Sequence, residues 1–274
     1  MQQQLAAICC NSSSNPFLAP ASWRACQCLT HLAVDLTAAD LPHALILDAA
    51  LQTISLVDLT LTVDFMFSAA SCLAFQQLSQ LTNLTQLNLH QELAGYEDAD
   101  GAAAMEQLLA AAARVSSLCQ LTVSSSNSRS NSGGSADGNT PFCMDLSALP
   151  HLTSLELGVW GLVVDLSTLA RAPALRQLSM SDCTVVGSLV SLFPLTSLTR
   201  LEGAFAMAAQ AYAPGSAAGL SEAPAAWRQD LRSLSWLDHD DDDGSTLWRL
   251  VVPRLTSLTQ LCMTDICVSS DFCR

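Results

Sequence analysis

The side chains best suited to chemistry in this 274-residue chain include His31 and His90, which fall on the same predicted face of a sheet. Asp35 follows His31 closely enough to orient its ring. We expect the two histidines to lie two strands apart, about 10 Å, given a strand spacing of roughly 5 Å. Histidine nitrogens sit about 2 Å from a bound metal, so the pair cannot share an ion. We interpret both as solvated surface residues with no catalytic or metal-binding role.

An acidic run, DHDDDDG, occupies residues 238–244. If Gly244 is taken as the invariant glycine of a helix-loop-helix calcium site, the first ligand position falls on His239. The twelfth position, which should be a glutamate, falls on Leu250. The calcium motif is therefore absent, and a solvated acidic loop that docks a basic partner is the favoured interpretation. A metal-dependent binder or enzyme that uses residues 238–243 is the alternative.

The eleven cysteines are odd in number and dispersed. Neither of the two groups they form has the paired C-x-x-C spacing of a structural zinc site; these groups are Cys9, Cys10, Cys26 and Cys28, and then Cys262, Cys267 and Cys273. We interpret them as small apolar core residues of a reducing compartment. The chain also lacks a glycine-rich phosphate loop, a G-x-S-x-G elbow and an H-E-x-x-H motif. We predict neither enzymatic activity nor a cofactor.

The chain carries 25 acidic and 11 basic residues, a formal net charge of −14, although only 13% of its residues are charged. Proteins that bind a phosphate backbone need clustered lysine and arginine. We therefore expect neither nucleic acid nor an anionic membrane as a partner. No apolar run approaches the roughly 20 residues that span a bilayer, and the N-terminus does not resemble a signal peptide. A cytoplasmic location, with association to the cytoskeleton as a variant, is predicted.

A recurring leucine dominates the rest of the sequence. The clearest copy is LSQLTNLTQLNL at residues 78–89. Equivalent anchor leucines, 22 to 34 residues apart, are Leu29, Leu51, Leu84, Leu118, Leu152, Leu175, Leu198, Leu231 and Leu258. In most copies apolar residues follow the anchor at the third and fifth positions. The last two of these have a period of two, which predicts a short strand with one buried face.

This pattern resembles the leucine-rich repeat family, of the irregular ribonuclease-inhibitor-like or F-box-associated type, over roughly residues 26–268. The resemblance implies an α/β fold, a solenoid or horseshoe of about nine repeats. A parallel sheet would line its concave side, with helices or turns on the convex side. The family places asparagine or cysteine three residues after the last apolar strand position, and here only Cys183 conforms. We therefore expect less regular loops.

The segments between strands predict the convex elements and the domain boundaries. A helix is expected over 101–117 with Asp100 as its N-cap, shorter helices over 41–51 and 65–81, and single turns capped by Asp145 and Asp165. Residues 1–24 form an N-terminal segment, partly disordered, and 25–274 form the repeat domain with inserts at 124–141 and 204–226. Few residues follow the last strand, so we expect a fragment, an oligomer or a capping partner at that end.

The resemblance implies protein recognition through the concave face, hence a non-enzymatic interaction scaffold. The second repeat should present Thr53, Ser55 and Val57 on that face. The predicted partner-binding residues are His31, Asp35, Gln86, Asn88, His90, Gln120, Thr122, Ser154, Glu156, Gln177, Ser179, Arg200, Glu202 and Gln260. Two alternatives stay open. One is the substrate-recognition part of an F-box type ubiquitin-ligase subunit, suggested by ASWRAC at residues 21–26, and the other is a cytoskeletal or ciliary scaffold.

Overall fold

The computed structural model describes residues 29–36, 55–64, 76–92, 107–125, 146–159, 162–181, 183–186, 189–204, 229–237, 257 and 259–264. The chain divides into two compact units. Unit 1 comprises Met1–Ser135 with Met144–Leu155, and unit 2 comprises Ala136–Cys143 with Glu156–Arg274.

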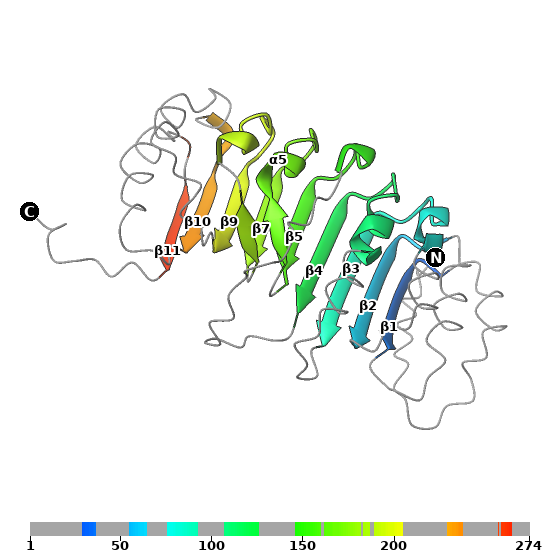
Figure 1. Ribbon diagram of the computed structural model, residues 1–274. Helices are drawn as coiled ribbons and strands as arrows, with labels where there is room; N and C mark the ends of the chain where they lie inside the picture. Colours follow the sequence, from blue (N-terminus) through cyan, green and yellow to red (C-terminus); the bar gives the residue numbers. More distant parts are fainter. Residues whose placement is uncertain are drawn as a thin grey trace, which may run out of the picture. The chain divides into compact units, whose positions relative to one another are not determined.

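Unit 1 is built on parallel strands that follow one another in sequence order: β1 (His31–Leu36), β2 (Asp58–Asp64), β3 (Gln86–Glu92) and β4 (Gln120–Ser125) (Figure 1). The register aligns His31 with Asp58, Asp58 with Gln86, and Gln86 with Gln120. One position further along, four leucines form a buried row: Leu32, Leu59, Leu87 and Leu121. Alternate residues of each strand therefore face the core, as a period of two requires.

Directly before the strands, apolar side chains recur at every third position. Leu78, Leu81 and Leu84 are fully buried, and the N–H groups of Leu81 and Leu84 each donate to the carbonyl three residues earlier, at 3.0 Å. Such bonding gives about three residues per turn, so every third side chain points to the same side. The same bonds recur at 112–115–118 and 146–149–152 in unit 1 and at 169–172–175 and 192–195–198 in unit 2.

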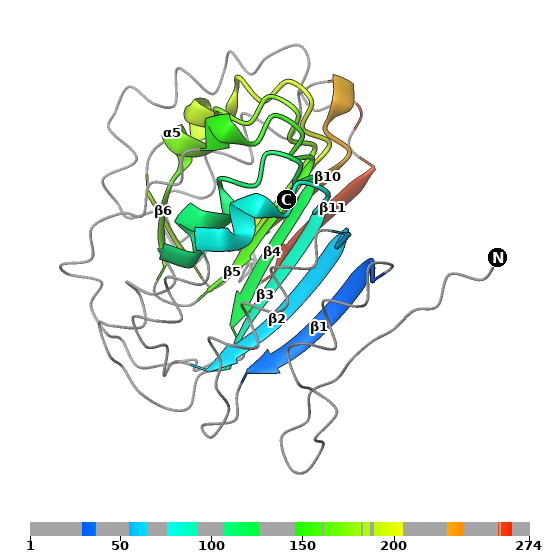
Figure 2. The ribbon, with the colours of Figure 1, turned by 90° about the vertical axis from the view of Figure 1, so that its right-hand side faces the viewer.

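The helical segments of unit 1 are short. They are the 3₁₀ helices η2 (Gln76–Gln80) and η3 (Leu146–Ala148) and helical residues 107–112. In Figure 2 the helical segments before β3 and β4 lie on one face of these strands. Leu108, Leu109 and Ala112 pack into the core, while Gln107 is exposed. The described helices therefore cover the apolar face of the sheet.

Unit 2 repeats this plan with β7 (Gln177–Ser181), β9 (Arg200–Ala204), β10 (Ser233–Leu237) and β11 (Gln260–Thr264), all parallel and in that order. β5 (Ser154–Gly158) gives its first two residues to unit 1 and the rest to unit 2. A smaller parallel pair joins β6 (Val163–Asp165) to β8 (Thr184–Val186). The connections include α5 (Leu166–Leu169) and the 3₁₀ helix η4 (Leu189–Leu192). The leucine-rich repeat solenoid with its parallel sheet is thus confirmed.

At most of the described anchor leucines, the backbone carbonyl directly after the leucine joins one repeat to the next. The carbonyl of Val57 accepts the N–H groups of both Thr85 and Gln86, at 2.8 and 3.0 Å. The same double acceptance recurs at the carbonyls of Thr30, Thr85 and Cys119 in unit 1 and of Arg176 and Thr199 in unit 2. These bonds fix the register at the start of the strands.

Hydroxyl side chains reinforce this junction. Four threonines directly after an anchor donate to the corresponding carbonyl of the preceding repeat, at 3.1–3.2 Å: Thr85, Thr153, Thr199 and Thr259. Ser55 and Ser117, directly before an anchor, donate to the carbonyls of Leu29 and Leu84, both at 2.7 Å. We name these six side chains the hydroxyl ladder. At the other end of the strand the buried thiol of Cys183, the residue that conforms to the family position, contacts the carbonyl of Leu157 at 4.0 Å.

The anchor of the second repeat was predicted at the wrong leucine. The register places Leu56, which is fully buried, on the same row as Leu29 and Leu84, so Leu51 is not the anchor. Both leucines begin an apolar pattern of the expected spacing, five residues apart. The strand-forming sequence LTLTV after Leu56, with its β-branched residues, determines which pattern forms the sheet.

The other predictions for the connections have mixed outcomes. Asp165 caps α5, since its Oδ1 accepts the N–H of Ser167 at 2.9 Å. The helix over 101–117 is confirmed at residues 107–112, and in the described part of 65–81 a 3₁₀ helix takes the place of a longer one. β4 includes Ser124 and Ser125, the first two residues of one insert, and β9 includes Ala204, the first residue of the other. No described helix is long and apolar enough to cross a membrane.

Several predicted features lie outside the described residues. They are the segment 1–24, the helix over 41–51, the caps Asp100 and Asp145, the remainder of both inserts, and the acidic run at 238–243. The division into residues 1–24 and 25–274, and the character of the C-terminal end, stay predictions.

Replacing Leu56 by alanine should lower the free energy of unfolding by about 2–5 kcal/mol, because it leaves a cavity at a fully buried anchor. Urea denaturation followed by circular dichroism measures the change. The exposed Gln80→Ala on η2 is the control and should stay within about 0.5 kcal/mol. Equal effects of the two substitutions would contradict the register described above.

Ser117→Ala should cost about 0.5–1.5 kcal/mol, because the carbonyl of Leu84 loses the donor that reaches it at 2.7 Å. Its exposed neighbour provides a matched control: Ser116→Ala should change stability by less than about 0.5 kcal/mol. The same denaturation measurement compares the two. A stability loss shared equally by both serines would argue that the hydroxyl ladder contributes nothing.

Candidate functional site: the polar face of the sheet

The face of the unit 1 strands opposite the leucine rows carries short polar side chains at alternate positions. We call this set the polar face; its described members are His31, Asp58, Thr60, Thr62, Gln86, Asn88, His90, Gln120, Thr122 and Ser124. It corresponds to the predicted concave face. Most of these side chains are half-buried, so each is fixed by its neighbours while still reaching solvent.

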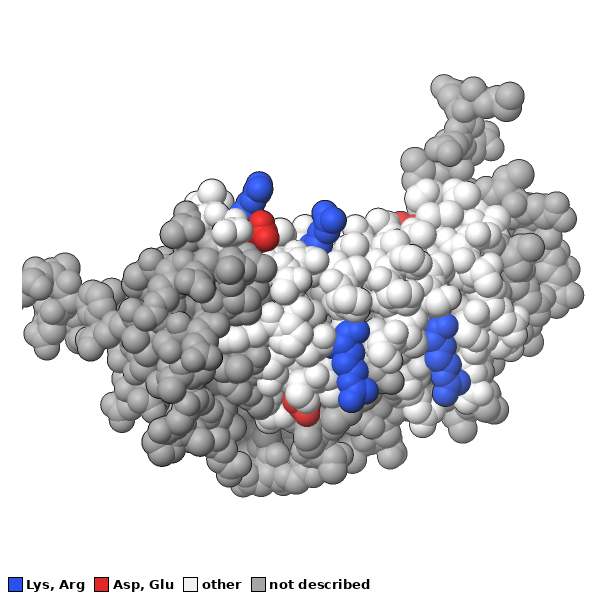
Figure 3. Space-filling model, turned by 90° about the horizontal axis from the view of Figure 1, so that it is seen from above, with Lys and Arg blue, Asp and Glu red and all other residues white. Residues whose placement is uncertain are grey.

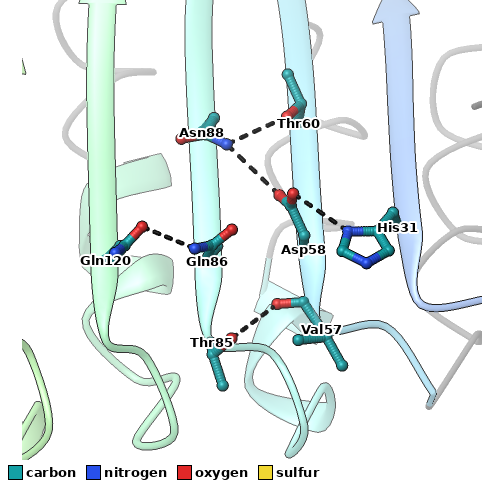
Figure 4. A network of polar contacts seen from close by, with 8 residues as sticks. All are labelled: His31, Val57, Asp58, Thr60, Thr85, Gln86, Asn88 and Gln120. Carbon is teal, nitrogen blue, oxygen red and sulfur yellow. Dashed lines mark hydrogen bonds and ion pairs between the residues drawn. The ribbon is translucent and has the colours of Figure 1, made fainter. Parts of the chain in front are cut away.

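A hydrogen-bond network runs across the strands on this face (Figure 4). Asn88 Nδ2 donates to Thr60 Oγ1 at 3.2 Å and lies 3.5 Å from Asp58 Oδ1. His31 Nδ1 lies 3.4 Å from Asp58 Oδ2. Gln86 Nε2 donates to Gln120 Oε1 at 2.8 Å. Four strands are thereby connected through side chains as well as through their backbones.

Asp58 is a central residue of this network and was absent from the predicted site. Because the second anchor is Leu56, the polar face receives Asp58, Thr60 and Thr62 in place of Thr53, Ser55 and Val57. Thr53 lies outside the described residues, Ser55 belongs to the hydroxyl ladder, and Val57 precedes β2. The alternation in DLTLTVD, read from Leu56, is the sequence signal that identifies these residues.

The two predicted site histidines have different partners. His31 contacts Asp58. The backbone of Asp35, which was expected to orient His31, aligns with that of Thr62 in β2, and its side chain lies outside the described part of the structure. His90 Nδ1 lies 2.9 Å from Ser124 Oγ. Among the described residues no group of three histidine, cysteine or acidic side chains could hold a metal ion.

Unit 2 presents a second set of predicted residues. Gln177 is exposed and Ser179 half-buried on β7. On β9, Arg200 forms a bidentate pair with Glu202, with Nε–Oε1 at 2.7 Å and Nη2–Oε2 at 2.9 Å. That hydrogen bonding raises the pKa of the Arg200 guanidinium, and the nearby charge of Glu156 adds to the effect. The guanidinium and both oxygens of Glu202 therefore already have a partner within the strand.

The remaining predicted partner-binding residues lie on β4, β5 and β11. Thr122 and Ser154 are half-buried on β4 and β5. Gln260 lies at the start of β11, where the described structure stops at the backbone. Ser233, the equivalent residue of β10, is buried, and its hydroxyl has no hydrogen-bond partner in the described part of the chain.

Charged side chains are sparse on the described surface. Figure 3 looks onto the end of the sheet where the strands begin, and there the arginine side chains stand apart on a mainly uncharged surface. The part of the described surface seen in this view thus shows no basic cluster of the kind that binds a phosphate backbone.

No protein-family model and no curated protein matches the sequence. Solved structures with some likeness include the leucine-rich repeat ectodomain of the Arabidopsis receptor kinase HAESA, in complex with an N-terminally extended IDA peptide hormone. It is 14% identical with a TM-score of 0.41, over 76% of this chain and 30% of that one. Another is the Leptospira interrogans leucine-rich repeat protein LIC12759, 13% identical with a TM-score of 0.30, over 92% and 76%. A third is TLR13 in its complex with ssRNA13, 14% identical with a TM-score of 0.36, over 95% and 43%.

These likenesses are too distant to indicate an activity or a partner, and this chain spans less than half of the HAESA and TLR13 chains. The class is established by the structure itself. Parallel strands in constant register, each entered through a buried leucine, define a repeat solenoid. The leucine spacing within each repeat makes it a leucine-rich repeat protein.

A double-mutant cycle on Gln86 and Gln120 should show that the polar face contributes little to folding. The hydrogen bond between them is exposed, so Gln86→Ala and Gln120→Ala should couple by no more than about 1 kcal/mol. Urea denaturation of both single variants and the double variant gives the coupling free energy. A coupling several times larger would make this face a structural element instead of a recognition surface.

Proposed function

We propose that this chain is a non-enzymatic scaffold that binds a protein partner through the polar face. One observation carries the proposal: hydrogen-bonding side chains occupy every outward position described on β1 to β4 except Ala33, directly above fully buried leucine rows. The buried leucines stabilise the repeats, and the polar side chains on the opposite face are accessible to another molecule. Their donors and acceptors recur at the strand spacing of about 4.8 Å.

The character of the side chains favours a protein as that partner. Glutamine, asparagine and threonine combine donors with acceptors and are uncharged, so they can pair with peptide groups and with polar side chains. Protein interfaces typically carry about one hydrogen bond per 100–200 Å². Nucleophilic catalysis would instead require a nucleophile, an activating base and an orienting group in contact. Within the described strands, His31 contacts an acid and His90 a serine, and the two contacts share no residue.

We also propose a cytoplasmic location, because the cysteines fit the role of small apolar residues, as the buried Cys183 does. The F-box alternative depends on residues 21–26, and the metal-dependent alternative on residues 238–243. Both segments lie outside the described residues, so these alternatives stay predictions.

Replacing Gln86, Asn88, Gln120 and Thr122 together by alanine should remove most partner proteins that the wild-type chain captures from a cell lysate. Quantitative mass spectrometry of the captured proteins measures the loss, which we expect to be about tenfold or more for specific partners. The matched control is Gln80→Ala with Gln107→Ala, two exposed glutamines on helical segments of unit 1.

Circular dichroism should show the same fold for both multiple variants. If the fourfold variant retained every partner, or if the control lost the same partners, the polar face would not be the binding surface.

A further inference from the structure

Asp58 and Gln86 form a patch of hydrogen-bond acceptors between β2 and β3. The two residues are aligned across the strands. Gln86 Nε2 donates sideways to Gln120, and Figure 4 shows its oxygen turned toward the strand that carries Asp58. An ionised carboxylate only accepts hydrogen bonds. We name Asp58 and the Gln86 oxygen the acceptor patch.

The carboxylate of Asp58 has unused capacity. It can accept about four hydrogen bonds, and the described residues bring two side-chain donors to it, from His31 at 3.4 Å and Asn88 at 3.5 Å. Strong N–H···O bonds are nearer 2.9 Å, so both contacts are weak. The Asp58 side chain is 26% exposed, which leaves its oxygens accessible to a donor from another molecule.

Glu202 in unit 2 provides the contrast. Both of its oxygens already accept from the guanidinium of Arg200, at 2.7 and 2.9 Å. Among the described residues, His31 is the one basic side chain within ion-pair distance of Asp58, at 3.4 Å. Among the described residues, Asp58 thus has no bidentate arginine partner of the kind that Glu202 has in Arg200.

We propose that the acceptor patch receives a basic side chain of the protein partner, arginine in preference to lysine. This inference rests on the proposed function and specifies the chemistry of the partner. A guanidinium carries five donors in a planar fork and no acceptor, so it can bond both oxygens of Asp58 and the oxygen of Gln86 together. The formal net charge of −14 also attracts a basic segment over longer range.

The test uses a phage-displayed library of random dodecapeptides selected on the full chain. Wild-type protein is compared with Asp58→Asn, which removes the charge and keeps the shape. The exposed Asp230→Asn is the matched control, because it removes the same charge elsewhere. We expect arginine to be enriched at one aligned position on wild type and on D230N, and not on D58N.

A synthetic peptide from the enriched pool then gives the magnitude by fluorescence anisotropy. Its affinity should fall about tenfold when arginine is replaced by the uncharged citrulline, or when the protein carries D58N, since each change removes a charge-assisted bidentate contact. Gln86→Glu provides a second variant whose effect has the opposite sign. It adds a negative charge beside Asp58 and should strengthen binding of the same peptide.

Arginine enrichment that persists on D58N, or a pool without arginine, would overturn this inference. A pool without arginine whose binding still depends on Gln120 and Thr122 would overturn it and leave the proposed function in place. Peptides that bind regardless of every substitution on the polar face, or no enrichment over an uncoated surface, would overturn both.

Discussion

At the start of the described strands, the peptide carbonyl directly after an anchor leucine bonds to the next repeat. This carbonyl accepts two N–H groups of the next repeat, as that of Val57 accepts those of Thr85 and Gln86. Buried peptide groups must be paired, because an unpaired one costs about as much free energy as a lost hydrogen bond. The anchor leucine beside it excludes water, and the bonded carbonyl sets the register. Neither contribution holds the strand in place without the other.

This junction explains why the core and the polar face can differ so much in character. Once the register is set at the start of the strand, alternate residues must point in opposite directions. The inward ones are almost all leucine, valine or methionine, and they supply most of the favourable free energy of folding. The outward-facing residues contribute less to the free energy of folding. A side chain such as Asn88 can therefore contact Thr60 and Asp58 with little consequence for stability.

The sequence was sufficient to predict the repeat architecture, because the leucines of the pattern are the residues that are buried in each repeat. It was insufficient for the second repeat, where Leu51 and Leu56 start overlapping patterns with the same spacing. The alternating, β-branched residues after Leu56 favour that leucine as the anchor. The pairing with neighbouring strands, which is not local in sequence, establishes it. The error removed Asp58 from the candidate site. The hydroxyl ladder could not be predicted either, because serine and threonine occur at many positions, and their bonds depend on which carbonyl the fold places opposite.

The distances between anchors have a consequence for how such a chain can change. Within unit 1 the anchors Leu29, Leu56, Leu84, Leu118 and Leu152 are separated by between 27 and 34 residues, yet the strands pair without a shift. The extra residues are taken up by the return segments, and closing a longer loop adds little entropy cost. The bonds at the start of the strands keep the register constant, while the segments between strands can vary in length. Sequence can thus be inserted or deleted there, and a foreign segment grafted, while the opposite surface keeps its chemistry.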